Sequence, residues 1–260
     1  MIKKGDKVIV KVGTSTLTYD TGMLNISKIE NLCKVIADLH NRGIKVILVS
    51  SGAVSAGKSK VKFLGGENDV SLKQAAAAVG QSELMNIYSR NLSLYGHTVA
   101  QILLTKDAFD NKDRYDQAKN TFNVLLDNGV IPVVNENDSV SCEGIKFGGN
   151  DILSAYVAVI VSADLLINLT DVDGLFDKDP RSNLDAKLIE KVTNLSEVEN
   201  VAKGAGTLRG TGGMQAKIMS AKLCGEAKIP MFIANGQDPA ILYDIVNGEA
   251  KGTYFVPEEK

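Results

Sequence analysis

Residues 7–15 read Lys-Val-Ile-Val-Lys-Val-Gly-Thr-Ser, and this stretch decides the fold class. Its β-branched residues predict a strand over residues 7–12, and a near-continuous apolar run is typical of a strand buried on both faces of a parallel sheet. Lys11 is the exception, because burying an ammonium group is costly unless an anion meets it. Gly13 then lets the backbone turn closely around a ligand. We expect Lys11 to meet an anion; the alternative is an edge-strand lysine whose amine extends to water.

Strand-like runs alternate with helical patterns along the rest of the chain. We expect further strands at 45–50, 98–104, 131–134, 165–169, 231–234 and 254–256, and helices at 27–42, 71–96, 114–128, 150–161, 213–227 and 239–248. Ser27 with Glu30 and Ser71 with Gln74 are expected to cap the first two helices, and residues 140–147 to form a small hairpin. This alternation predicts an α/β protein whose mainly parallel sheet is covered on both faces. In such folds ligands bind beyond the carboxyl ends of the strands.

Composition narrows the class of protein. The chain has 260 residues and a net charge of −2, with 44% hydrophobic and 23% charged residues, which is ordinary for a globular protein. Near-zero net charge disfavours electrostatic capture of nucleic acid. No membrane helix or signal peptide is visible, and three widely spaced cysteines (Cys33, Cys142 and Cys224) suggest neither a disulfide framework nor a zinc site. We expect a cytoplasmic protein that acts on small molecules.

Three strand or helix ends carry clusters of small or polar residues. Ser50-Ser51-Gly52-Ala53 could present backbone N–H groups to an anion, although a plain turn explains it equally well. Asn135-Glu136-Asn137-Asp138 suits an ammonium group or a polar substrate, with a solvated turn as the alternative. In Gly149-Asn150-Asp151, which opens an apolar helix, one polar residue serves as an N-cap and the acid could hold lysine side chains in position.

Residues 210–217 read Gly-Thr-Gly-Gly-Met-Gln-Ala-Lys and open another expected helix. A glycine-rich loop before a helix favours phosphate, because unpaired N–H groups and the helix dipole both attract an anion. Lys217 lies in the first or second turn, where a cation is mildly disfavoured unless an anion is bound nearby. A flexible surface loop is the alternative.

Residues 52–59 match the P-loop pattern Gly-x4-Gly-Lys-Ser and follow a strand. In a P-loop the lysine begins a helix whose dipole helps to bind phosphate. Here residues 59–70 contain two adjacent glycines and lack a sustained apolar stripe. This interpretation also leaves Lys11 and Lys217 without a role, so a P-loop NTPase that uses Lys58 is the less favoured alternative.

Taken together, these motifs resemble the amino-acid kinase family over nearly the whole chain and in the family's order. They are Lys11–Ser15, Ser50–Ala53, Asn135–Asp138, Gly149–Asp151 with Leu153–Ala155, Leu169–Asp171 and Gly210–Met214. Gly13-Thr14 is similar to the branch that phosphorylates L-glutamate, whereas aspartokinase and acetylglutamate kinase typically have two glycines there. The resemblance implies a three-layer α/β/α sandwich, MgATP, and phosphorylation of the γ-carboxylate of L-glutamate, the first step toward proline. A carboxylate kinase of the same fold acting on aspartate or acetylglutamate is the other alternative.

The resemblance also implies roles for individual residues. The expected catalytic residues are Lys11 and Lys217, which would bind the β- and γ-phosphates, and Asp151, which would orient both lysines. Glutamate would be held by Ser51, Gly52, Asn135, Asp138 and Asn150. ATP would be held by Lys11, Gly13, Thr170, Asp171, Thr211, Gly212, Gly213, Met214, Gln215, Ala216 and Lys217, with Lys146 a weaker phosphate candidate. No residue is assigned to a metal; the series Asp107, Asp110, Asp113 and Asp116 is interpreted as a solvated loop and helix start.

We expect residues 1–260 to form one kinase domain, in which about 1–150 bind glutamate and about 151–260 bind ATP. Many family members continue into a C-terminal PUA domain, whereas this sequence ends soon after residues 252–255, so the kinase domain is expected to stand alone. The resemblance also implies a homo-oligomer, a dimer or a tetramer, and inhibition by proline.

A γ-carboxylate with a reference pKa of about 4.3 needs no general base near neutral pH, and both histidines, His40 and His97, are interpreted as structural or surface residues.

Overall fold

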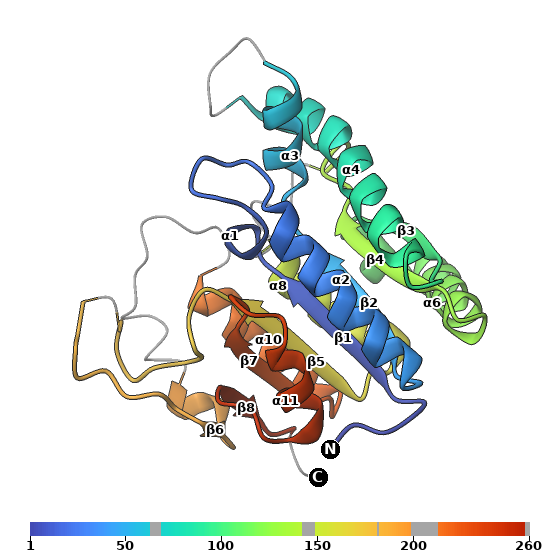
Figure 1. Ribbon diagram of the computed structural model, residues 1–260. Helices are drawn as coiled ribbons and strands as arrows, with labels where there is room; N and C mark the ends of the chain where they lie inside the picture. Colours follow the sequence, from blue (N-terminus) through green and yellow to red (C-terminus); the bar gives the residue numbers. More distant parts are fainter. Residues whose placement is uncertain (63–68, 142–148, 181, 199–212, 258–260) are drawn as a thin grey trace.

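The computed structural model describes residues 1–62, 69–141, 149–180, 182–198 and 213–257. One eight-stranded sheet crosses the molecule and carries helices on both faces (Figure 1). The strands are β1 (Lys7–Val12), β2 (Lys45–Ser50), β3 (Val99–Leu104), β4 (Ile131–Glu136), β5 (Leu165–Thr170), β6 (Lys191–Val192), β7 (Met231–Asn235) and β8 (Thr253–Phe255). The helices are α1 (Thr14–Leu17), α2 (Ile26–Asn41), α3 (Ala53–Lys60), α4 (Val70–Ser93), α5 (Asp107–Asp110), α6 (Lys112–Asp127), α8 (Gly149–Val161), α10 (Met214–Glu226) and α11 (Ile241–Asn247). The predicted α/β class is confirmed.

The order of strands is β3-β4-β2-β1-β5-β7-β8-β6, and only β7 with β8 is antiparallel among the described pairs. β1 therefore lies inside the sheet, hydrogen-bonded to β2 on one side and β5 on the other. The alternative in which Lys11 belongs to an edge strand is wrong. Because these strands run parallel, the carboxyl ends of β1, β2, β4 and β5 meet at one edge of the sheet.

Alternate residues of each strand point to opposite faces of the sheet and form two separate cores. Val8, Val10 and Val12 belong to the core that includes α2, α4 and α11. Ile9 belongs to the other core, which includes α6, α8 and α10. The result is the three-layer α/β/α sandwich, and strand alternation points Lys11 to the same side as Ile9, toward α8 and α10.

The first two long helices begin with caps other than those predicted. Asn25 caps α2, where its side chain accepts a hydrogen bond from the backbone N–H of Lys28, so the predicted pair of Ser27 and Glu30 lies inside the helix. Asp69 caps α4 by accepting from the N–H groups of Ser71 and Leu72. In both cases an Asn or Asp two residues before the predicted cap accepts from the unpaired N–H groups of the first turn.

Several short elements were not predicted, namely α1, α3, α5 and β6; α5 contains Asp107 and Asp110, which were interpreted as part of a solvated loop. The most important is α3, which begins directly after Gly52, a residue with a positive φ of 97°. The predicted hairpin at 140–147 lies mostly outside the described residues, because 142–147 are not among them.

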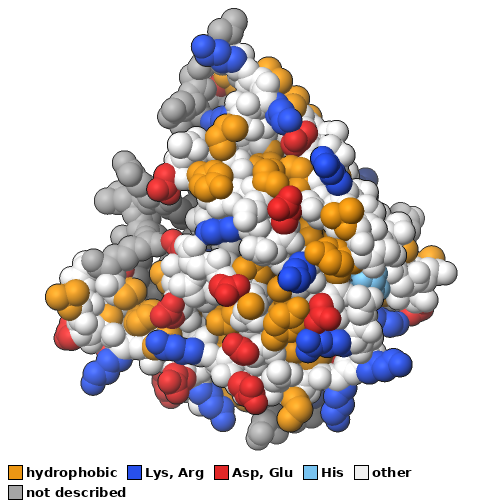
Figure 2. Space-filling view, viewed as in Figure 1, with side chains coloured by type: hydrophobic (Ala, Val, Ile, Leu, Met, Phe, Trp, Pro, Cys, Tyr) orange, Lys and Arg blue, Asp and Glu red, His pale blue; other side chains and the backbone are white. Residues whose placement is uncertain are grey.

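Basic and acidic side chains are interspersed over the face in Figure 2, in keeping with the small net charge. In the described ranges no helix is both long and apolar enough to cross a membrane.

Candidate active site

Three charged side chains from distant parts of the chain meet near the carboxyl end of β1. Asp151 lies in the first turn of α8, between Lys11 of β1 and Lys217 of α10. Its Oδ1 is 2.5 Å from the Nζ of Lys11, and its Oδ2 is 3.1 Å from the Nζ of Lys217. The exposed fractions of the three residues are 6%, 2% and 7% for Lys11, Asp151 and Lys217. We call Lys11, Asp151 and Lys217 the charge triad.

The electrostatics of the charge triad favour an added anion. Burial alone would raise the pKa of Asp151, but Lys11 and Lys217 outweigh burial and lower this pKa below its ordinary value. Burial lowers the pKa of Lys11; Asp151 raises it, and Lys217 lowers it again. Two amines therefore contact one carboxylate in a water-poor site, where an anionic phosphate group would be attracted strongly to them.

Asn168 also belongs to this site, although it was not predicted from the sequence. It is fully buried on β5, directly beside Lys11 in the register of the sheet. Its Nδ2 donates a 2.7 Å hydrogen bond to Oδ1 of Asp151 and helps to fix that carboxylate. The available signal was the one used for Lys11, a polar side chain within the otherwise apolar strand at residues 165–169.

A second group of side chains lies beside the charge triad, at the carboxyl ends of β2 and β4. We call it the amide network; its members are Ser50, Ser51, Gln81, Tyr88, Asn135 and Asn150. The Nδ2 of Asn150 lies 2.9 Å from three acceptors, the backbone oxygen of Ser50, Oγ of Ser51 and Oδ1 of Asn135. Asn150 directly precedes Asp151, so the first turn of α8 contributes one residue to each group.

Two members of the amide network, Gln81 and Tyr88, were not selected from the sequence. Both are buried residues of α4, and the hydroxyl groups of Tyr88 and Ser50 are 2.8 Å apart. Gln81 accepts a 2.9 Å hydrogen bond from Nδ2 of Asn135. The signal was a glutamine on the same helical stripe as buried Leu84 and Tyr88, at a position where an apolar residue is expected.

Asp138 lies two residues beyond the end of β4, on the same side of the sheet edge as the network. Burial, together with neighbouring Glu136, raises its pKa to about 6. The described part of the structure records no hydrogen bond between Asp138 and the amide network. A partly buried carboxylate of this kind gains from a cation, and an ammonium group would supply one.

The predicted nucleotide residues are only partly described. Thr170 ends β5, and its hydroxyl donates to Oδ1 of Asp171 over 3.2 Å. Gly213 is the N-cap residue of α10, so the next four residues, Met214, Gln215, Ala216 and Lys217, form the first turn of that helix. At Gly13 an added Cβ would lie 3.6 Å from the Nζ of Lys11, so the loop after β1 passes close to the triad. Thr211, Gly212 and Lys146 lie outside the described residues.

The P-loop alternative fails on geometry. Lys58 is exposed and lies in the last turn of α3, not at the start of a helix. The carboxyl end of a helix has a partial negative charge and disfavours phosphate. The helix that would serve a phosphate instead begins at Ala53, five residues before the lysine.

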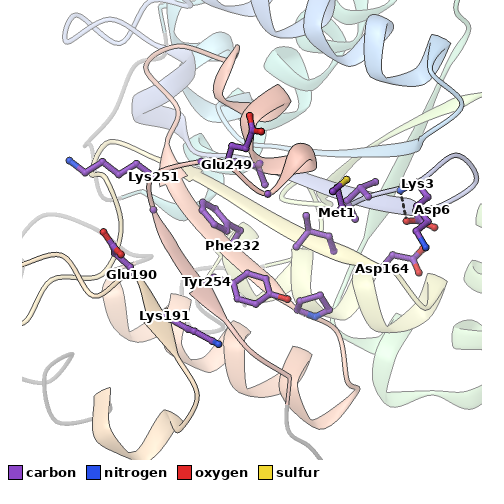
Figure 3. Close-up of a pocket in the computed structure, with 17 residues that line it drawn as sticks. Met1, Lys3, Asp6, Asp164, Glu190, Lys191, Phe232, Glu249, Lys251 and Tyr254 are labelled. Carbon is purple, nitrogen blue, oxygen red and sulfur yellow. Dashed lines mark hydrogen bonds between the residues drawn. The ribbon is translucent and has the colours of Figure 1, made fainter.

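The opposite edge of the sheet contains a cleft that none of the predicted site residues lines, among those that the structure describes. A cleft of about 880 Å³ lies there, lined by residues that precede β1, β5 and β7, among them Asp6, Asp164 and Pro230. In Figure 3 Phe232 and Tyr254 lie at its middle. The residues recorded as lining it include four acids and three lysines, and none of the predicted site residues.

The two histidines also lie away from the charge triad. Nε2 of His40 is 3.2 Å from the backbone oxygen of Gly129, just before β4, and the two rings form an edge-to-face pair with centroids 4.8 Å apart. This placement agrees with their interpretation as structural residues.

Comparisons with known proteins agree with the geometry. The sequence profile described as "Amino acid kinase family" matches residues 6–235. A glutamate 5-kinase of Clostridium perfringens is 47% identical over 99% of this chain and 98% of the relative, and one of Clostridium acetobutylicum is 49% identical over 98% and 96%. A solved carbamate kinase from Giardia lamblia bound to AMP-PNP has a TM-score of 0.69 at 16% identity, covering 98% of this chain and 99% of that chain. The structural match shows a shared fold.

Proposed function

The chain belongs to the amino acid kinase family, and from this premise we propose that it transfers the γ-phosphoryl group of ATP to the γ-carboxylate of L-glutamate. The observation that carries the proposal is the charge triad, in which two amines from opposite ends of the chain share one carboxylate. The high identity to glutamate 5-kinases over nearly their full length supports glutamate as the acceptor. The product would be an acyl phosphate, L-glutamyl 5-phosphate.

The chemistry needs charge neutralisation more than proton transfer. The γ-carboxylate of glutamate has a reference pKa of about 4.3, so it is already a nucleophile at neutral pH. The difficulty is to bring this anion against the anionic γ-phosphate and to stabilise the charge of the transferring group. Preorganised cations in a site poor in water provide such stabilisation without reorganising during the reaction.

We assign that task to the charge triad. Lys11 and Lys217 would bind the β- and γ-phosphates, and Asp151 would hold the two amines apart from each other and aimed at the same space. Asn168 supports this arrangement, because its amide fixes one oxygen of Asp151. The first turn of α10 would contribute N–H groups to the phosphates, as helix N-termini do.

Mg²⁺ would enter as a complex with ATP. Both oxygens of Asp151 are already engaged by an amine or an amide, and no cluster of three His, Cys, Asp or Glu side chains able to hold a metal occurs in the described ranges. Such a site suits Mg²⁺ held mainly through phosphate oxygens and water, which is how this ion is commonly bound. When bound, Mg²⁺ would supply further neutralisation of the phosphate charge.

The acceptor would bind on the amide network. Ser51, Gly52, Asn135 and Asn150 surround the carboxyl ends of β2 and β4, and Asp138 offers a carboxylate for the α-ammonium group. We therefore propose that residues 1–150 mainly bind glutamate and residues 151–260 mainly bind ATP. The two parts meet at Asn150 and Asp151.

One assay tests this function. Hydroxylamine converts an acyl phosphate to a hydroxamate, so the protein with MgATP, hydroxylamine and L-glutamate should form γ-glutamyl hydroxamate. Aspartate and N-acetylglutamate in parallel reactions should form far less. Hydroxamate with aspartate alone, or ATP hydrolysis without hydroxamate, would overturn the proposal.

A homo-oligomer, inhibition by proline and a cytoplasmic location stay predictions of the resemblance; the first two can be checked by mass photometry and by adding proline to the same assay.

A further inference from the structure

Helix α4 contributes two buried polar side chains to the amide network, Tyr88 through Ser50 and Gln81 through Asn135. Gln81 is buried on the sheet-facing side of α4, with an exposed fraction of 9%. Its Oε1 accepts a 2.9 Å hydrogen bond from Nδ2 of Asn135, a residue that is itself 2% exposed. A buried amide pair of this kind fixes the position of both side chains, because each loses a hydrogen bond if either one rotates.

The amide of Asn135 is held from both sides. Its Oδ1 accepts from Nδ2 of Asn150 and from the backbone N–H of Glu136, each over 2.9 Å. Its Nδ2 donates to Gln81. A rotation that exchanged the oxygen and the nitrogen of Asn135 would place two acceptors against each other at Gln81 and two donors against each other at Asn150. Gln81 thus fixes the NH2 group of Asn135, while Asn150 and Glu136 fix its oxygen.

Gln81 is itself held in place by an unusually close contact between α3 and α4. A Cβ added to Gly80 would lie 1.7 Å from the backbone oxygen of Ala53, and one added to Gly57 would lie 1.8 Å from that of Ala76. The two helix backbones therefore touch directly, and α4 cannot shift without moving α3. Since α3 begins directly after Gly52, this close contact also links the loop at Ser51 and Gly52 to the part of α4 that carries Gln81.

We propose that Gln81 is a positioning residue for the acceptor substrate, acting through Asn135. It does not need to touch glutamate; it holds the Asn135 amide so that one N–H of the NH2 group is used internally and the other is available to a carboxylate oxygen of the substrate. The inference rests on the proposed function in one respect, that the substrate bound on the amide network is glutamate. It predicts an effect on glutamate binding that ATP binding does not share.

The experiment compares two near-isosteric substitutions on the same helix. Gln81→Met removes the contact with Asn135, whereas Asn91→Leu is the matched control. Asn91 is equally buried, and among the described residues its side chain donates only to the backbone oxygen of Ile87 within α4. We expect Gln81→Met to raise KM for glutamate roughly tenfold, the effect of one lost neutral hydrogen bond. KM for ATP should stay within about twofold, and Asn91→Leu should leave both KM values near those of the wild type.

Two further variants keep the test decisive if Gln81→Met does not fold. Gln81→Asn keeps an amide but withdraws it from Asn135, so it should also raise KM for glutamate. Gln81→Glu keeps an acceptor at the same reach and should restore KM toward the wild-type value. Equal KM for glutamate in Gln81→Asn and the wild type, or equal increases for glutamate and ATP, would overturn the role of Gln81. Absence of γ-glutamyl hydroxamate in the wild type would instead overturn the proposed function.

Discussion

The charge triad and the amide network consist of different kinds of chemical group. The charge triad consists of two lysines and one aspartate that come from β1, α10 and α8. Its attraction for an anion depends on these residue types more than on the exact orientation of each side chain. The amide network consists of neutral donors and acceptors whose partners are each fixed by a neighbour. Under the proposed function, the phosphate half would govern how fast the reaction runs, whereas the acceptor half would govern which acid is bound. Each prediction below separates these two roles.

Removing one amine of the charge triad should produce the largest effect. Lys217→Ala or Lys11→Ala leaves Asp151 with a single amine partner. It also removes one cation from the place where the transferring phosphoryl group would lie. We expect kcat to fall by about a thousandfold or more, as when preorganised electrostatic groups are deleted elsewhere. Steady-state kinetics with circular dichroism as a check on folding would measure this.

Lys58→Ala is the matched control for the lysine variants. Lys58 is exposed in the last turn of α3, so kcat should change by less than about twofold. The opposite result, with Lys58→Ala inactive and Lys217→Ala active, would show that phosphate binds at residues 52–59, as the P-loop alternative requires.

Asp138→Asn should affect the binding of glutamate without affecting the binding of ATP. It removes the carboxylate proposed to meet the α-ammonium group while keeping the size of the side chain. We expect KM for glutamate to rise about 30-fold, the effect of losing one charge-assisted hydrogen bond, with KM for ATP nearly constant. Asp127→Asn, which removes an exposed partner of Lys45 at the other edge of the sheet, should change neither. Equal increases in the two KM values would remove Asp138 from the acceptor site.

A smaller effect should appear with pH. Burial and Glu136 raise the pKa of Asp138 to about 6, so its charged form is lost as the pH falls from 7 to 5, well above the ordinary range for an aspartate. At pH 5 about one-tenth of the Asp138 side chains stay ionised, and KM for glutamate should be roughly tenfold higher than at pH 7. The γ-carboxylate of the substrate stays mostly ionised in this window. In Asp138→Asn the rise should disappear; a rise that persists in that variant assigns it to another group.

The sequence was sufficient for those parts of the fold that depend on local pattern. The strands at residues 7–12 and 45–50 match the predicted bounds, because unbroken β-branched runs identify buried parallel strands. Helix α3 was missed for the opposite reason. Its residues are small and carry no apolar stripe, and what stabilises it is backbone contact with α4 at Gly57 and Gly80, which no local pattern records.

The site divides in the same way. Lys11, Asp151 and Lys217 could be selected because a charge in an apolar strand or at the start of a helix is locally anomalous. That one carboxylate contacts both amines follows from the order of strands in space, which only the structure gives. Gln81 and Asn168 are ordinary polar residues, and their importance comes from partners 54 and 17 positions away in the sequence.

The central place of Lys11 has a consequence for how the protein comes to be made. A growing chain emerges from the ribosome in order, so the lysine of β1 is available long before residue 151 and longer still before residue 217. Any partly folded form that closes β1 between its neighbours before α8 has docked would enclose an ammonium group with no counter-ion, which is energetically forbidding. We therefore expect the core on the α8 and α10 side of β1 to close only once Asp151 has docked, whereas the core on the α2 side carries no such requirement.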